Sequence, residues 1–153
     1  MTEVSAEEYL CTRIRRADQA LMSHHEAVLR SYGLTMTQYT VLLTLSREGG
    51  MSGAQLARAC GVTEQTMAPV LTGLQNKELV VRKTSPVHAK VLIASLTELG
   101  QEMLALAYGE VAVLERALAD GFTPTEQQSL SDLLDRATAI LAQQARQADA
   151  PPR

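Results

Sequence analysis

Apolar residues recur every three or four positions along most of the chain, which is the spacing of helices with one buried face. Two long segments, 5–32 and 97–147, carry such stripes, and Ser5 is suited to cap the first of them. A polar residue, His24, interrupts the first stripe. The residues between these two segments are too few to bury both stripes, so the pattern indicates a partner subunit.

Between the long helices, residues 34–96 combine three short helical patterns with two β-rich runs. Thr35, Ser52 and Thr63 stand where N-caps are expected, and Gly61 suits the sharp turn between the last two helices. The runs 79–84 and 90–96 predict a two-stranded hairpin. The sequence therefore predicts one mostly α-helical domain over residues 1–153, with a small β-wing. Its winged helix-turn-helix head, residues 34–96, is flanked by the long helices.

The helix after Thr63 has the composition of a helix that enters the major groove of DNA. The face opposite its apolar stripe begins with short or polar side chains, whereas bulky residues would hold the helix away from the bases. Basic residues on the hairpin are suited to contact phosphates and the adjacent minor groove. The DNA-binding candidates from this pattern are Ser52, Thr63, Gln65, Thr66, Pro69, Arg82, Lys83 and Lys90.

The charge distribution supports binding to DNA. The protein has a net charge of −3, but residues 30–91 hold seven Lys or Arg against three acidic residues. The net charge is therefore +4 over this segment, while it is −2 over residues 1–29 and −5 over residues 92–153. A positive field coincides with the predicted head, where it would attract the DNA backbone.

Three segments resemble the MarR family of bacterial transcription regulators: GLTMTQYTVLLTL (33–45), SGAQLARACGVTEQTMAPVLTGLQNKELVVR (52–82) and VLIASLTELG (91–100). The resemblance implies a homodimer joined through the first helix and the last two, with recognition helices in successive major grooves of a pseudo-palindromic operator. It also implies repression that a small phenolic ligand or oxidation relieves. In the family's wing an Asp and an Arg precede the last strand. His88 and Lys90 occupy those positions here, which adds His88 to the DNA-binding candidates.

One hypothesis for the signal is a small aromatic or phenolic ligand that releases a repressor from double-stranded DNA. Its pocket would lie between the helical dimer arm and the head. The candidates for that pocket, chosen on position alone, are His24, Met36, Tyr39 and Met103.

A second hypothesis is oxidation of Cys11, which resembles the reactive cysteine of the organic-hydroperoxide-sensing branch of the family. That branch also has a proline in its recognition helix, and Pro69 resembles it. The branch has tyrosines four and fourteen residues after its cysteine, where this chain has Arg15 and His25. Either residue would lower the thiol pKa when cationic, but His25 can meet Cys11 only across an antiparallel dimer. Cys60 is expected in the core.

Other classes of function find little support in the residues. The sequence has no motif of a nucleotide-binding loop, a serine hydrolase or a zinc protease, so we expect neither an enzyme nor a cofactor. The His and Cys residues show no established metal-ligand spacing. Without a signal peptide or a long apolar run, a cytoplasmic protein is expected. The alternative of another class is a dimeric protein-interaction module without operator binding.

Overall fold

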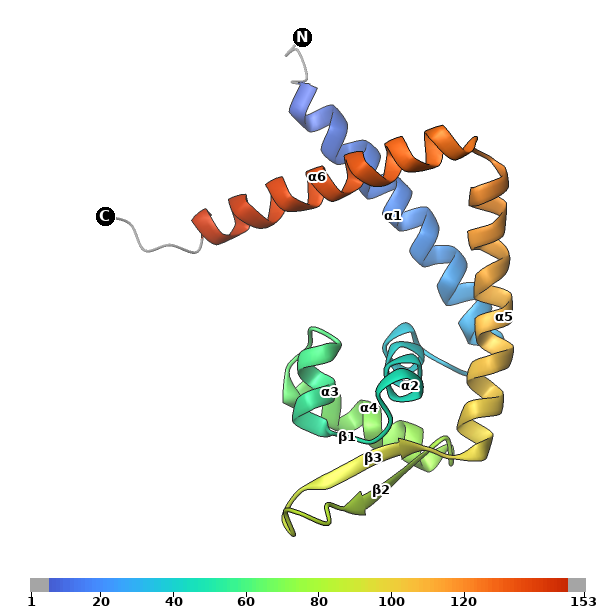
Figure 1. Ribbon diagram of the computed structural model, residues 1–153, viewed down its shortest axis with the longest axis vertical. Coiled ribbons are helices and arrows are strands. Elements are labelled where there is room, and N and C mark those ends of the chain that lie inside the picture. Colours follow the sequence, from blue (N-terminus) through green and yellow to red (C-terminus); the bar gives the residue numbers. More distant parts are fainter. Residues whose placement is uncertain (1–5, 149–153) are drawn as a thin grey trace. The chain divides into compact units, whose positions relative to one another are not determined.

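The computed structural model describes residues 6–148, which form six α-helices and three short strands (Figure 1). The chain divides into two compact units, Met1–Val111 and Ala112–Arg153. The predicted N-cap Ser5 lies outside the described residues. In chain order the elements are α1 (Ala6–Ser31), α2 (Met36–Glu48), β1 (Met51–Ser52), α3 (Gly53–Ala59), α4 (Glu64–Asn76), β2 (Val80–Thr84), β3 (Leu92–Leu96), α5 (Glu98–Asp120) and α6 (Pro124–Ala148).

The predicted helix starts within the head are confirmed by their hydrogen bonds. The hydroxyl of Thr35 accepts a bond from the backbone N–H of Gln38, and the side chain of Gln38 accepts one from the N–H of Thr35, both at 3.2 Å. Ser52 and Gln55 form the same reciprocal capping box at the start of α3. Each box satisfies two N–H groups that a helix start leaves free, so local sequence fixes where these helices begin.

The sheet has three antiparallel strands in the order β1-β3-β2, whereas the sequence predicted two. The added strand pairs Met51 with Ala94, on the side of β3 away from β2. Two residues are too few to show an alternating pattern, so the third strand gave no signal in the sequence. The last strand also begins at Leu92 and not at Lys90, which lies in a turn.

In the first unit the inner faces of the helices and the sheet pack together to form the hydrophobic core. In α4 the predicted apolar face is confirmed, since Met67, Leu71 and Leu74 are buried and Val70 packs against them. The largest fully buried side chains are Leu29, Leu42, Leu56, Met67, Leu71, Leu74, Val41 and Val80. This packing holds α3 and α4 beside the hairpin (Figure 1).

In α1 the residues buried within the first unit lie one position after the predicted stripe. His25 and Leu29 are 7% and 0% exposed, whereas Leu10 of the stripe is 62% exposed. The physical reason is that only the C-terminal part of α1 packs on the head, and that packing sets which face turns inward. In a single chain the stripe is exposed at Leu10 and half-buried at Leu21 and Val28.

The second unit contains the end of α5 and all of α6. Thr123 caps α6 by accepting a hydrogen bond from the N–H of Glu126, whose carboxylate accepts one from the N–H of Thr123 in return. The N–H and the hydroxyl of Thr123 both donate hydrogen bonds to this carboxylate, which hold the pKa of the exposed Glu126 below its usual value. No residue of α6, as far as the structure describes it, is buried. Across residues 6–148 no helix is both long and apolar enough to span a bilayer.

Candidate nucleic-acid interface and ligand groove

The recognition helix α4 presents an exposed polar N-terminal end. Thr63 caps it, with its hydroxyl accepting a 3.1 Å hydrogen bond from the N–H of Thr66. The hydroxyls of Thr63 and Thr66 are also hydrogen-bonded to each other at 2.9 Å, and either can be the donor. Gln65 lies between them in the sequence and is exposed. The cap thus orders the first turn while leaving the Gln65 side chain free to reach a base edge.

Pro69 lies inside α4, one turn after Gln65. A proline has no N–H, so the carbonyl of Gln65 does not receive the hydrogen bond that residue i+4 normally donates. Gln65 and Pro69 are both exposed. Pro69 therefore alters the backbone chemistry of the recognition helix beside its candidate reading residue.

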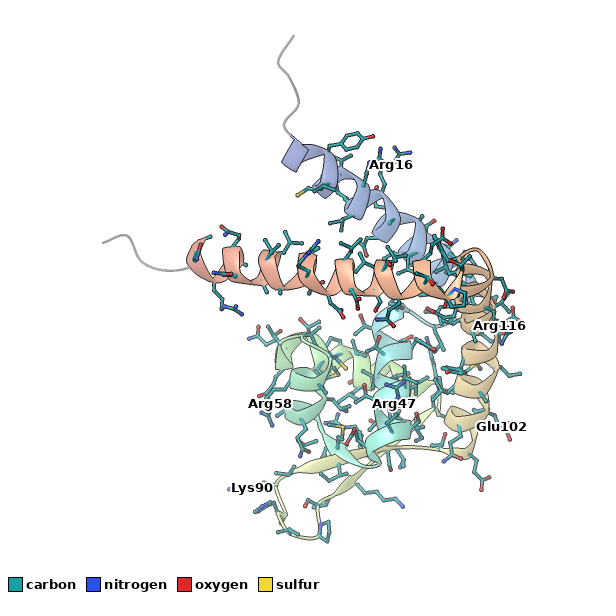
Figure 2. The ribbon with its side chains drawn as sticks, turned by 45° about the horizontal axis from the view of Figure 1, so that its top comes forward. Arg16, Arg47, Arg58, Lys90, Glu102 and Arg116 are labelled. Carbon is teal, nitrogen blue, oxygen red and sulfur yellow. The ribbon has the colours of Figure 1, made fainter. Side chains whose placement is uncertain are left out.

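The basic candidates of the hairpin lie on β2 and on the loop after it. Lys83 is exposed on β2, and Arg82 is half-buried opposite Ala94. The Nε atom of Arg82 is buried and has no hydrogen-bond partner within residues 6–148. Lys90 lies exposed in the loop that ends the hairpin (Figure 2). The guanidinium of Arg82 and the ammonium of Lys90 are cations of the kind that bind phosphate.

The loop of the wing is braced by Ser85, a residue that the sequence analysis did not single out. Its hydroxyl accepts 3.2 Å hydrogen bonds from the N–H groups of Val87 and His88, and its own N–H donates a 2.7 Å bond to the carbonyl of Val91. The carboxylate that the family resemblance would place at His88 is therefore not needed to order this loop. The side chain of His88 stays exposed.

A cleft of about 390 Å³ separates the wing from the two helices of the helix-turn-helix. Ser52 and Ala54 line it from the start of α3, and Glu64 lines it from the start of α4. Arg82 and Lys90 line it from the wing. The fold thus brings together three residues that the sequence named separately, Ser52, Arg82 and Lys90, around the first turn of the recognition helix.

A second cavity, of about 350 Å³, is lined by α2, β3 and the part of α5 that belongs to the first unit. Its polar lining comes from Ser46, Arg47, Gln101 and Tyr108, and its apolar lining includes Leu104. A volume of this size suits a small organic ligand, and an exposed arginine beside apolar walls suits an aromatic acid. Neither Arg47 nor Tyr108 was predicted from the sequence, because the two residues lie far apart in it.

Tyr39 is the ligand candidate with an electrostatic link to this second cavity. Burial raises the pKa of its phenol, the nearby Tyr108 raises that pKa further, and the Arg47 charge lowers it in part. None of His24, Met36, Tyr39 and Met103 lines the second cavity itself. Met36 and Met103 are half-buried and pack against the core.

Cys11 and His25 do not meet within one chain. Cys11 is exposed on α1, whereas His25 is buried fourteen residues later on the same helix. That separation is about 21 Å at 1.5 Å per residue. The ring of His25 instead contacts the ring of His24, edge to face, with centroids 6.0 Å apart. Cys60 packs partly buried against the core, as expected.

Comparisons with known proteins agree with this geometry. Residues 32–90 match the sequence model of the MarR family. The chain is 30% identical to the HTH-type transcriptional repressor Rv2887 of Mycobacterium tuberculosis, in an alignment that covers 79% of this chain and 87% of that one. The chain belongs to the MarR family. It is therefore a DNA-binding transcription regulator, not an enzyme.

Two solved structures are similar to this chain along most of its length. One is the transcriptional repressor CouR bound to a 23-mer DNA duplex, with a TM-score of 0.77 and 25% identity. That match covers 90% of this chain and 99% of CouR. The other is Rv2887 of M. tuberculosis in complex with p-aminosalicylic acid, with a TM-score of 0.64 and 29% identity over 84% of this chain and 98% of that one.

Proposed function

We propose that the protein is a homodimeric repressor that binds a pseudo-palindromic operator and leaves it when a small aromatic acid binds. The observation that carries the DNA part is the cleft between wing and recognition helix, lined by Ser52, Arg82 and Lys90. We assign base readout to Gln65 and Thr66 at the exposed start of α4, since side chains there reach base edges in helix-turn-helix proteins. Wing cations hold the phosphate backbone.

The DNA part is tested with the purified protein and two duplexes, one from its own upstream region and one of random sequence. We expect tighter binding to the upstream duplex and an affinity that falls steeply as salt increases, because bound cations release counterions from DNA. Equal affinity for both duplexes, or none for either, would favour the protein-interaction module over operator binding.

The homodimer is supported by the apolar stripe of α6. Leu130, Leu133, Leu134, Ile140 and Leu141 are each between 41% and 54% exposed and recur at helical spacing. A stripe of this length left in water would be costly, whereas a second copy covers it by symmetry.

The test of the dimer uses a charge on the stripe and a matched charge off it. Leu134→Glu is expected to yield monomers in analytical ultracentrifugation and to lose operator binding. Ala139→Glu adds the same charge on the opposite side of α6 and is expected to remain dimeric. A wild-type protein that sediments as a monomer would overturn this part of the proposal.

Release by an aromatic acid is supported by the cavity that Arg47 and Tyr108 line. A guanidinium binds a carboxylate through paired hydrogen bonds, and the apolar walls suit an aromatic ring. The relative Rv2887 supplies a probe, p-aminosalicylic acid. Binding in a groove between α2 and α5 would change how these helices pack, and α2 contacts the recognition helix.

The release experiment adds p-aminosalicylic acid to the protein–DNA complex and follows the bound fraction. Arg47→Gln should require about tenfold more acid for release, since it loses a charged hydrogen-bond pair. Glu48→Gln, the next exposed residue, is the control. A complex that stays intact in the acid but dissociates with an organic hydroperoxide would instead support oxidation of Cys11 as the signal, provided that Cys11→Ser abolishes this response.

A further inference from the structure

Lys77 fixes the C-terminal end of the recognition helix to the turn between α1 and α2. Its ammonium donates one hydrogen bond to the backbone carbonyl of Gly33 and another, of 2.9 Å, to Oε1 of Gln38. Gly33 is the second residue after α1, and Gln38 belongs to the first turn of α2. One side chain therefore joins three helices, although Lys77 is separated from Gly33 by 44 positions in the sequence.

Gln38 is the second member of this connection. Its Oε1 accepts hydrogen bonds from Lys77 and from the N–H of Thr35, so the same oxygen caps α2 and holds α4. Its amide nitrogen lies against Gly73 of α4, where an added Cβ would come within 3.1 Å of that nitrogen. The absence of a side chain at Gly73 is what lets the Gln38 amide lie this close. We call Lys77, Gln38, Gly33 and Gly73 the Lys77 joint.

The ammonium of Lys77 is engaged at the end of α4 that is opposite the candidate reading residues. Lys77 caps the C-terminus of α4, thirteen residues after its first residue Glu64, which is about 20 Å along the helix. The carbonyl that it binds lies at the C-terminal end of α1, where the helix dipole favours a cation. Lys77 is exposed, as Lys83 and Lys90 of the wing are, but its ammonium is hydrogen-bonded within the protein.

We propose that Lys77 is a positioning residue for operator binding, because the Lys77 joint sets the angle between the recognition helix and α1. The inference rests on the proposed homodimer, in which α1 belongs to the dimer arm. In such a dimer the angle of α4 to α1 determines how far apart the two recognition helices lie. Half-sites about one helical turn apart are bound together only when that distance is held. The joint therefore sets the half-site spacing that the dimer accepts.

The experiment uses a duplex that the wild-type protein selects from random-sequence DNA, and derivatives with one base pair inserted or removed between the half-sites. Lys77→Met removes both hydrogen bonds and keeps an unbranched side chain. We expect it to weaken binding to the selected duplex by about fivefold or more. We also expect it to discriminate less than wild type against the altered spacings.

The salt dependence of affinity separates positioning from contact with DNA. Lys83→Met, the matched control on the wing, should make the slope of log affinity against log salt shallower by about one unit, as for a lost phosphate contact. Lys77→Met should leave that slope unchanged. Lys77→Arg retains donors and should restore part of the spacing preference, while Gly73→Ala should weaken the preference without any change in charge.

Several outcomes would overturn the inference. One is a Lys77→Met protein with wild-type affinity and spacing preference, and another is a salt slope that falls as it does for Lys83→Met. A Lys77→Met protein that loses affinity only in proportion to its unfolded fraction, measured by urea titration, would make Lys77 merely structural. If wild type shows no spacing preference, the homodimer proposal fails and the inference fails with it.

Discussion

The hydroxyl of Thr97 donates a 2.6 Å hydrogen bond to the backbone carbonyl of Glu78. Thr97 stands between β3 and α5, and Glu78 follows the recognition helix, so the bond ties the start of α5 to the end of α4. The N–H of Thr97 also donates to the carbonyl of Leu79, at 3.1 Å. The Thr97 hydroxyl in turn accepts a 2.9 Å bond from the N–H of Gly100 and so caps α5.

Replacing Thr97 with valine should lower the free energy of unfolding by about 1–2 kcal/mol. The change keeps the shape of the side chain but removes both a helix cap and a hydrogen bond to a backbone carbonyl. Thr97→Ser retains the hydroxyl, so its free energy of unfolding should fall by much less. Urea titration followed by circular dichroism gives both values, and equal losses for the two variants would contradict the prediction.

Two glycines of α5 should respond to alanine with opposite signs. A Cβ at Gly100 would stand 2.0 Å from the carbonyl oxygen of Leu79, and backbone atoms cannot move aside cheaply. Gly100→Ala should therefore cost about 2–4 kcal/mol of stability. At Gly109 a Cβ meets nothing within 4 Å, so Gly109→Ala should stabilise the helix by about 0.5–1 kcal/mol. Thermal and urea unfolding of both proteins provide the comparison; a stabilised Gly100→Ala protein would refute the close contact.

Glu78 is the one non-glycine residue with a positive φ in the described part of the chain, at 59°. That conformation costs a residue with a Cβ about 1–2 kcal/mol, and glycine avoids most of this cost. The greater freedom of glycine in the unfolded chain offsets part of the gain. We expect Glu78→Gly to raise the unfolding free energy by about 0.5–1 kcal/mol, while Glu78→Ala keeps the Cβ and gains nothing. A Glu78→Gly protein less stable than Glu78→Ala would contradict the expected strain.

The protein should lose stability at alkaline pH, where Tyr39 ionises. Burial and the neighbouring Tyr108 raise the pKa of its phenol above the ordinary value of 10.0, so the folded protein holds this proton more tightly than the unfolded chain. The resulting stabilisation is full below pH 10.0 and is lost as the pH rises through the folded pKa. Tyr39→Phe cannot titrate and should lose less stability over that range. Tyr9→Phe, which removes an exposed phenol, should behave as wild type in the same urea titrations.

Substitutions at Gln65 and Lys90 should affect DNA affinity differently, because Gln65 is assigned to base readout and Lys90 to the phosphate backbone. Gln65→Ala should lose affinity for the preferred duplex by about 1–3 kcal/mol and little for random DNA, since a base contact is lost. Lys90→Ala should weaken binding to all sequences alike and make the salt slope shallower by about one unit. Fluorescence anisotropy at several salt concentrations measures both. Equal losses on the two duplexes for Gln65→Ala would remove Gln65 from base readout.

The sequence by itself determined where the helices of the head begin, because the capping signals are local. Thr35, Ser52 and Thr63 satisfy free N–H groups within three residues, and these short-range bonds form in the same way in any tertiary setting. The same holds for the apolar face of α4, whose spacing is visible in the chain. The family also followed from the sequence, since its motifs are contiguous segments.

Only the tertiary structure decided which distant residues meet. Strand β1 exists because Met51 pairs with Ala94, and the cavity beside α2 exists because Arg47 and Tyr108 line the same groove. The face of α1 that is buried within a single chain depends on how the helix packs on the head, and it lies one residue after the apolar stripe. The hydrogen bond from Lys77 to the carbonyl of Gly33 also forms only because of how the helices pack. Non-local contacts depend on the packing of whole elements, and a periodic pattern along the chain carries no information about which partner each element will have.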